Sequence, residues 1–150
     1  MSKANNNWSG FSVKRANWEL NQQEITSIRE QVFLTEQHVT PELEWDGLDE
    51  TAEHLLAVDH RGSAIGYARI VDQQRIGRMA VLPDWRGLGV GKALLQMAIA
   101  TCRVSGCKEI SLSAQCYAIG FYEQAGFKVC SEEYLDADIP HRDMTLHLSN

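Results

Sequence analysis

The stretch from Ile76 to Leu95 holds residues whose types and spacing are suited to binding a phosphate group. An apolar, strand-like segment ends at Pro83, a turn rich in Arg and Gly follows, and an amphipathic helix begins near Val90. The first amides of a helix have no partner within the helix, and the helix dipole places positive potential there. Glycine lets the backbone approach a ligand closely and adopt a positive φ. The arrangement therefore predicts a phosphate or pyrophosphate site at the start of this helix.

Two common nucleotide-binding loops do not fit this stretch. A Walker A loop needs Gly, four residues, then Gly-Lys-Ser/Thr, but Arg86 and Ala93 stand at the first and last of these positions. The dinucleotide fingerprint Gly-x-Gly-x-x-Gly does not fit either: started at Gly87 it requires glycine at Lys92, and started at Gly89 it requires glycine at Leu94. What remains is Arg-x-x-Gly-x-Gly over residues 86–91. This is either a specific phosphate loop or an ordinary glycine-rich turn between a strand and a helix.

A second cluster of chemically useful residues runs from Ser113 to Phe127, with Gln115 seven residues before Tyr122 and Gly126 four residues after it. Together with the Arg-Gly loop, this segment resembles the GNAT acetyltransferase superfamily. The patterns of that family are Arg/Gln-x-x-Gly-x-Gly/Ala and Asn-x-x-Ala-x-x-x-Tyr-Glu-x-x-Gly-Phe. Gln115 stands where the family often has Asn, and it carries the same amide one methylene further out.

The resemblance implies an acetyl-CoA-dependent N-acetyltransferase in which a primary amine attacks the thioester directly in a ternary complex. Amides of the fourth strand would bond the pantetheine arm, and amides of the loop would hold the pyrophosphate with a lysine nearby. No Cys/His cluster has the spacing of a metal site. The implied cofactor-binding residues are Met79, Ala80, Val81, Arg86, Gly87, Leu88, Gly89, Val90, Gly91, Lys92, Gln115, Phe121 and Tyr122.

By the same resemblance, Tyr122 is a candidate general acid. A phenol with a pKa of about 10 can give a proton to a departing thiolate whose conjugate acid has a pKa near ~8.5. The alternative is that Phe121 and Tyr122 simply pack their short helix against the sheet. Cys116, which lies beside this motif, is a less favoured acyl-carrying nucleophile.

The general base is less well defined. Many relatives carry a Glu on the fourth strand, but residues 75–80 contain no carboxylate. Glu44 and His141 are the favoured candidates, with Asp46 as a further carboxylate in the same acidic segment. His54 opens a strand and is expected to be structural, whereas three other histidines are expected at the surface: His38, His60 and His147.

The composition narrows the class of protein. The net charge of −6 and a pI of about 5.3 disfavour a nucleic-acid binder, which would usually carry a basic face. No segment has the apolar length of a membrane span, and the polar N-terminus has no secretion signal, so a cytoplasmic location is expected. The four cysteines form no Cys-x-x-Cys pair and are expected to be reduced and mostly buried.

The acceptor is expected to be the amine of a small molecule or peptide. The segment 42–53 is rich in carboxylates, which would attract a cationic acceptor, and Trp45 and Leu48 would either cap the core or form the acceptor wall. A homodimer is compatible with the family. Two alternatives stay open: a CoA-binding sensor with little turnover, and a transferase for longer acyl groups.

The elements that must position these residues follow from the apolar periodicity. We expect a tail over residues 1–10 and one domain over residues 11–150, with an α/β (α+β) fold. The resemblance implies a mixed, mostly antiparallel sheet of six to seven strands, flanked by helices, with the fourth and fifth strands splayed apart. The predicted strands are 11–15, 55–58, 64–71, 75–82, 109–114, 127–130 and 144–148, and the predicted helices are 20–35, a short irregular one within 36–53, 90–105 and 117–126.

Overall fold

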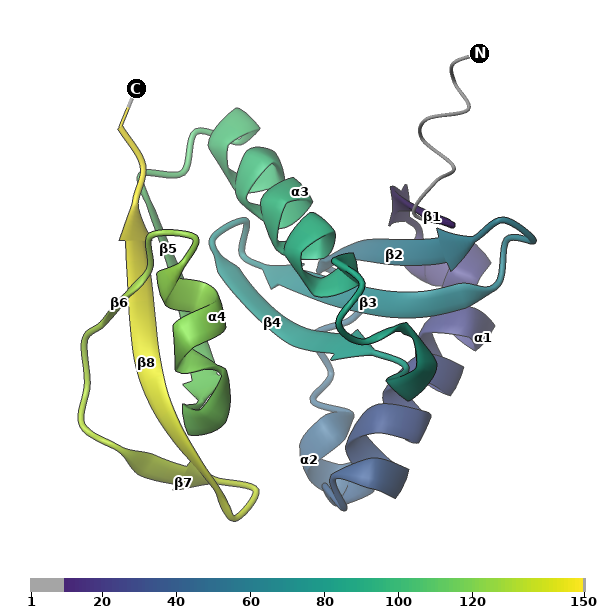
Figure 1. Cartoon of the computed structure of the whole chain (residues 1–150), viewed down its shortest axis with the longest axis horizontal. Coiled ribbons are helices and arrows are strands. Elements are labelled where there is room, and N and C mark those ends of the chain that lie inside the picture. The colour runs from purple at the N-terminus through teal and green to yellow at the C-terminus, as the bar shows by residue number, and fades with distance from the viewer. Residues whose placement is uncertain (1–9, 150) are drawn as a thin grey trace.

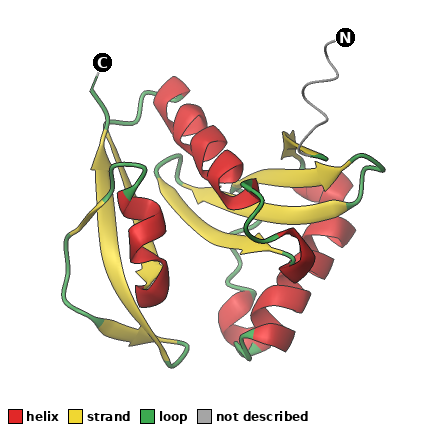
Figure 2. Cartoon of the chain, viewed as in Figure 1, coloured by secondary structure: helices red, strands yellow, loops and turns green. Residues whose placement is uncertain are grey.

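A mixed sheet forms the centre of the molecule, with helices on both of its faces (Figures 1 and 2). The computed structural model describes residues 10–149, so the predicted tail lies outside the described residues except for Gly10. The elements are β1 (Phe11–Ala16), α1 (Trp18–Arg29), the π-helix η2 (Glu30–Glu36), α2 (Pro41–Glu44), β2 (Glu53–Asp59), β3 (Ala64–Val71), β4 (Arg75–Val81), η3 (Pro83–Trp85), α3 (Val90–Val104), β5 (Glu109–Gln115), η4 (Cys116–Ala118), α4 (Ile119–Glu123), β6 (Lys128–Val129), β7 (Tyr134–Asp136) and β8 (Ile139–His147).

The strand order is β1-β2-β3-β4-β5-β8-β6, and β7 pairs with β8. All neighbouring strands are antiparallel except β4 and β5. The mixed sheet is as predicted, but it has eight strands instead of six or seven. The additional strand, β7, has all three residues exposed, so its sequence carries no alternation of apolar and polar residues.

The core explains why the central strands are apolar on both faces. Leu55 and Ala57 of β2 belong to the cluster packed under α3, whereas Leu56 and Val58 belong to the cluster packed under α1. Successive side chains of a strand point to opposite faces, so both faces of β2 are buried. The helix α3 lies especially close to the sheet at Gly66, where an added Cβ would stand 2.8 Å from a Val90 methyl carbon.

The sheet divides into two halves between β4 and β5. These strands share a single pair of opposed Cα atoms, Arg75 and Ser111, and then separate (Figure 1). An extra residue in β4 marks the divergence: Tyr67 opposes Ala80 and Arg69 opposes Gly77, so two β4 residues face one β3 residue. Arg78 lies at this bulge with a φ of +52°. Bulges bend a strand, which accounts for the predicted splay.

Two other regions differ from their predicted form. The helix expected over 20–35 begins earlier, where the Asn17 side chain accepts a hydrogen bond from the Leu20 amide, and it continues as a π-helix to Glu36. No strand was predicted between residues 131 and 143, but this segment contains the β7–β8 hairpin, turned at Ala137 and Asp138, which both have positive φ. The sequence signal was missed because neither turn residue is glycine.

Two kinds of feature are absent from residues 10–149. No helix there is both long enough and apolar enough to cross a bilayer. No group of three or more His, Cys, Asp or Glu side chains in the same range is arranged to hold a metal ion.

Candidate acyl-transfer site

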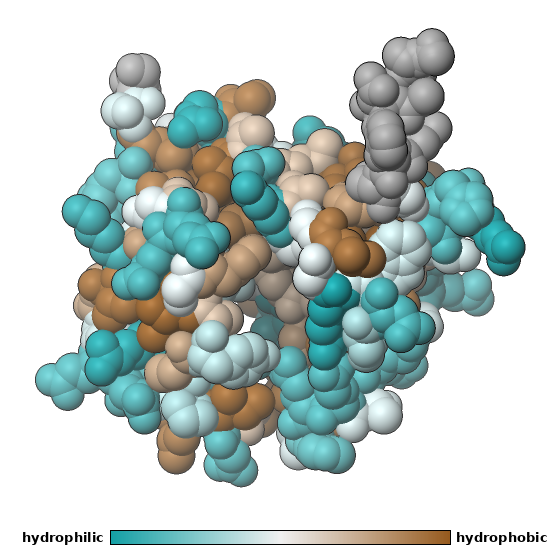
Figure 3. Space-filling model, viewed as in Figure 1, coloured by the Kyte–Doolittle hydropathy of each residue, from teal (hydrophilic) through white to brown (hydrophobic). Residues whose placement is uncertain are grey.

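A cavity of about 480 Å³ occupies the space where β4 and β5 diverge. One wall comes from β4, the opposite wall from β5, η4 and the β7–β8 hairpin, and a third from η2 and the α2 segment. The space-filling view shows this face of the molecule hollowed between its two halves (Figure 3). Of the predicted catalytic residues, Glu44, Tyr122 and His141 all line this cavity.

The β4 amides predicted to hold the cofactor arm face the gap. The amide of Leu82 donates to the Ile65 carbonyl of β3 at 2.9 Å. Because successive N–H groups of a strand point to opposite edges, the amides of Met79 and Val81 point away from β3, toward β5. By the same alternation Ala80 belongs to the β3 edge, and its buried side chain packs against η2.

The glycine-rich loop presents a run of free amides at the start of α3. Within residues 10–149, the backbone amides of Gly87 to Lys92 make no hydrogen bond to a backbone acceptor. Gly87 and Gly89 have φ values of +78° and +90°, which L side chains rarely adopt. Lys92 lies exposed in the first turn of α3.

The side chain of Arg86 has a different role from the loop amides. It donates to the Val81 carbonyl at 2.9 Å and forms two bonds to the Glu36 carboxylate, at 2.7 and 2.6 Å. The hydrogen bonds from Arg86 lower the pKa of Glu36. Arg86 therefore fixes the loop to β4 and to the π-helix.

The two sequence motifs meet in space at Phe121. Its ring lies 3.5 Å from the position of an added Cβ on Gly91 and packs edge-on against Tyr122, with centroids 5.0 Å apart. Tyr122 is 9% exposed and lines the cavity, and its hydroxyl makes no hydrogen bond within residues 10–149. Burial raises the pKa of Tyr122 to about 12, so the hydroxyl keeps its proton throughout the physiological range.

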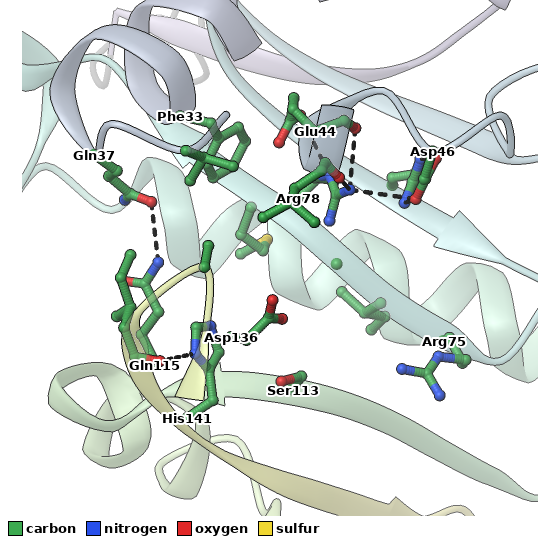
Figure 4. Close-up of a pocket in the computed structure, with 18 of the residues that line it drawn as sticks. Phe33, Gln37, Glu44, Asp46, Arg75, Arg78, Ser113, Gln115, Asp136 and His141 are labelled. Atoms are coloured by element: carbon green, nitrogen blue, oxygen red, sulfur yellow. Dashed lines mark hydrogen bonds and ion pairs between the residues drawn. The ribbon is translucent and has the colours of Figure 1, made fainter. Parts of the chain in front are cut away.

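His141 is positioned by its own strand in a defined tautomer. Its Nδ1 lies 2.6 Å from the Ile139 carbonyl oxygen, which can only accept, so Nδ1 carries the proton (Figure 4). The neutral ring then has its lone pair on Nε2. Tyr134 stacks on the imidazole with centroids 6.1 Å apart, and the residue is 8% exposed. A buried imidazole with one free nitrogen beside a cavity can accept a proton.

Glu44 belongs to a buried group of opposite charges, which we call the ion cluster. Its Oε2 accepts from Arg29 at 2.6 Å and lies 3.2 Å from Nε of Arg78. Burial raises the pKa of Glu44, while the two guanidinium groups act in the opposite sense. Because this oxygen is held by two cations, Glu44 is less available as a base than His141. The ion cluster comprises Arg29, Arg69, Arg78, Glu44, Asp46 and Asp49.

The ion cluster changes the interpretation of the acidic segment. Asp46 pairs with Arg69 at 2.7 Å, and Asp49 pairs with Arg29 at 2.7 Å and with Arg69 at 2.9 Å. The buried carboxylates of the segment are therefore neutralised by internal arginines and do not form a free anionic wall. Trp45 lies under the Arg29 guanidinium, and Leu48 lines the cavity.

Other candidates have partners of their own. Gln115 donates from Nε2 to the Gln37 side chain at 3.0 Å, which links β5 to the end of η2 across the cavity (Figure 4). His54 is buried between the Tyr67 hydroxyl, at 2.6 Å, and the Asp49 carbonyl, at 2.8 Å, as expected of a structural histidine. The pKa of Cys116 is raised by desolvation and by Glu133, which disfavours the nucleophilic thiolate.

Two further expectations concern the surface. His38, His60 and His147 are exposed, as predicted. The cysteines are less buried than expected: Cys102 is buried, whereas Cys130 is exposed and the other two are intermediate.

A row of hydrogen-bonded polar side chains lies beside the cavity and was not predicted. The Ser113 and Tyr134 hydroxyls are hydrogen-bonded, and Tyr134 donates to the Asp143 carboxylate at 2.5 Å. The register places Ser113 opposite Asp143 and Gln115 opposite His141. The alternation in residues 109–115, with buried Ile110, Leu112 and Ala114 between polar residues, was the available signal for a polar face here.

Comparison with known proteins agrees with this geometry. The family model of the GNAT acetyltransferase domain matches residues 18–148. A UPF0039 protein of Schizosaccharomyces pombe is 39% identical over 83% of this chain and 87% of its own length. The uncharacterised N-acetyltransferase YjcF of Bacillus subtilis is 36% identical over 78% of this chain and 86% of its own.

Solved structures give the same result. An acyl-CoA N-acyltransferase from Pseudomonas aeruginosa superposes with a TM-score of 0.79 at 29% identity, covering 91% of this chain and 99% of that one. Escherichia coli ElaA superposes with a TM-score of 0.82 at 28% identity, over the same shares of the two chains. The splayed sheet, the glycine-rich loop at α3 and the family match together establish that this chain belongs to the GNAT acetyltransferase family.

Proposed function

We propose that the protein is an acetyl-CoA-dependent N-acetyltransferase that transfers an acetyl group to a primary amine by direct attack in a ternary complex. The observation that carries the proposal is the cavity at the diverging strands. It brings the Tyr122 hydroxyl and the His141 imidazole to the same space as Met79 of β4, whose amide points into the gap.

The residues present fit a CoA-type ligand. The free amides of Gly87 to Lys92, together with the α3 dipole and the Lys92 ammonium, suit a pyrophosphate. The gap-facing amides of Met79 and Val81 suit an amide-containing arm. Acetyl-CoA supplies an activated thioester carbonyl when bound.

The acceptor amine must lose a proton before it attacks. An amine with a pKa of about 10.4 is neutral in only one part in a few thousand at pH 7, a deficit of roughly 4–5 kcal/mol. Among the cavity residues, His141 is best placed to accept that proton, on the lone pair of its Nε2 atom, either directly or through a water. The protonated Tyr122 hydroxyl supplies a proton for a departing thiolate.

Thiol release from acetyl-CoA across a panel of amines tests the proposal. His141→Gln should lower kcat by roughly 10²–10⁴-fold, the usual contribution of a general base, with CoA affinity unchanged. His147→Gln, an exposed histidine on the same strand, is the matched control and should retain full activity. Tyr122→Phe should lower turnover while CoA binding is retained.

The outcome also separates the enzyme from a CoA-binding sensor. Tight CoA binding without amine-stimulated thiol release would favour the sensor. Near wild-type turnover in His141→Gln would remove His141 as the base and return Glu44 to consideration, which Glu44→Gln would then test.

A further inference from the structure

Arg75 is the one arginine lining the cavity that has no carboxylate partner within residues 10–149. The other two, Arg69 and Arg78, are bound by Asp46, Asp49 and Glu44. Because three arginines and three carboxylates of the ion cluster balance one another, Arg75 contributes a positive charge that nothing in that cluster neutralises.

The position of Arg75 defines the far end of the cavity. Its Cα opposes Ser111 where β4 and β5 still pair, whereas His141 opposes Gln115 at the end of β5. The two positions are four residues apart along β5, or roughly 13 Å. Figure 4 shows Arg75 at the opposite end of the cavity from Gln115 and His141, with Ser113 between them.

Two further unpaired charges line the cavity. Asp72 lies in the β3–β4 turn three residues before Arg75, and Asp136 lies on β7. Neither makes an ion pair within the described residues. In Figure 4 the Asp136 carboxylate lies closer to His141, the proposed base, than to Arg75. The cavity therefore offers a carboxylate near its reactive end and a guanidinium at its far end.

We propose that the acceptor carries, besides its amine, an anionic group that binds Arg75. This inference rests on the proposed function for the identity of the amine end, but binding of the anion needs no turnover. A guanidinium is suited to carboxylate or phosphate, which it can bind with two parallel hydrogen bonds. The spacing along β5 selects acceptors whose anion is several bonds from the amine, such as an ω-amino acid or an aminoalkyl phosphate, over an α-amino acid.

The test is calorimetric binding of matched probes, with and without saturating CoA. Wild-type protein should bind 5-aminopentanoate roughly tenfold or more tightly than pentylamine, as expected for a charge-assisted contact. The probe 4-aminobutyl phosphate distinguishes phosphate from carboxylate as the anion. Arg75→Gln should abolish the preference while changing pentylamine binding less than twofold, and Asp72→Asn should tighten 5-aminopentanoate. Arg103→Gln, an exposed arginine in the last turn of α3, is the control.

Three results would overturn the inference: no preference for the anionic probes in the wild type, a preference that survives Arg75→Gln, or an equal loss for pentylamine in that variant. Arg75-dependent binding without thiol release from any amine would support the anion site and refute the proposed transferase activity alone. The two proposals can therefore fail separately.

Discussion

Replacement of Arg29 by Met should be among the most destabilising single changes in this chain. The Arg29 side chain is fully buried and bonds the Glu44 carboxylate at 2.6 Å, the Asp49 carboxylate at 2.7 Å and the Glu44 carbonyl at 3.0 Å. Its guanidinium also lies over the Trp45 ring, 4.6 Å from the centroid. Methionine replaces only the aliphatic part of the arginine side chain and carries no charge, so two buried carboxylates would each lose one cation.

The expected cost follows from the desolvation of these carboxylates. Removing one partner of a buried pair costs about 3–5 kcal/mol, because the remaining charge stays buried without compensation. Arg78 and Arg69 still hold the two carboxylates, which keeps the expected value within this range. At about 2–4 °C per kcal/mol for a domain of this size, the melting temperature should fall by roughly 6–20 °C.

Urea unfolding measures the change in free energy and thermal unfolding the change in melting temperature, both followed by far-UV circular dichroism. Tryptophan fluorescence is unsuitable because Arg29 lies over the Trp45 ring. Arg15→Met is the matched control: Arg15 pairs with Glu53 at 3.2 Å, but its side chain is 66% exposed, so less than about 1 kcal/mol is expected. Adding Glu44→Gln to Arg29→Met should recover part of the loss. If Arg29→Met costs no more than Arg15→Met, the ion cluster does not stabilise the fold as argued.

Two further changes test the loop and the ion cluster. Gly89 has a φ of +90°, so Gly89→Ala should strain the loop backbone and weaken CoA binding, measured by calorimetry. The control is Gly62→Ala, at a φ of +86° in the β2–β3 turn. Both variants should lose about 1–2 kcal/mol of stability, but Gly62→Ala should bind CoA as the wild type does. If the two variants bound CoA equally tightly, CoA binding would not depend on the backbone conformation at Gly89. Burial acts to raise the pKa of Asp46, but hydrogen bonds from Arg69 and the Leu48 amide outweigh it and lower the value to about 2. Because its pKa is lowered, the Asp46 carboxylate stabilises the folded protein at pH values above its unfolded-state pKa of about 3.9, and this contribution is lost as the pH falls toward 2. In Asp46→Asn, the free energy of unfolding should therefore decrease less steeply with falling pH between about 4 and 2.

The sequence predicts best where local chemistry and periodicity act together. Strands β3 and β4 and helix α3 lie within one residue of their predicted bounds, because turns or glycines mark their ends. Gly106 and Gly126 have the positive φ expected at helix ends. Tyr122 and His141, both candidates from the sequence, line the same cavity.

What the sequence does not reveal depends on contacts between distant segments. The carboxylates of residues 44–49 have no cationic residue near them in the sequence, and only the fold brings Arg29, Arg69 and Arg78 beside them. The pairing of Arg86 with Glu36 spans fifty residues and has no local signature. The bulge at Arg78 also has no sequence signal, because its positive φ occurs at a residue other than glycine. The Arg78 side chain is held in place by hydrogen bonds to the Leu43 and Glu44 carbonyls.

The single Cα pair between β4 and β5 has a consequence for the cooperativity of the molecule. The half from β1 to β4 and the half from β5 to β8 each have continuous ladders, but few backbone hydrogen bonds join them, one being from the Ser111 amide to the Gln74 carbonyl. Amides on the two facing edges should therefore exchange with solvent much faster than those between β2 and β3. A ligand that bonds both edges would act as a removable strand, raising the protection of both halves together and converting two folding units into one.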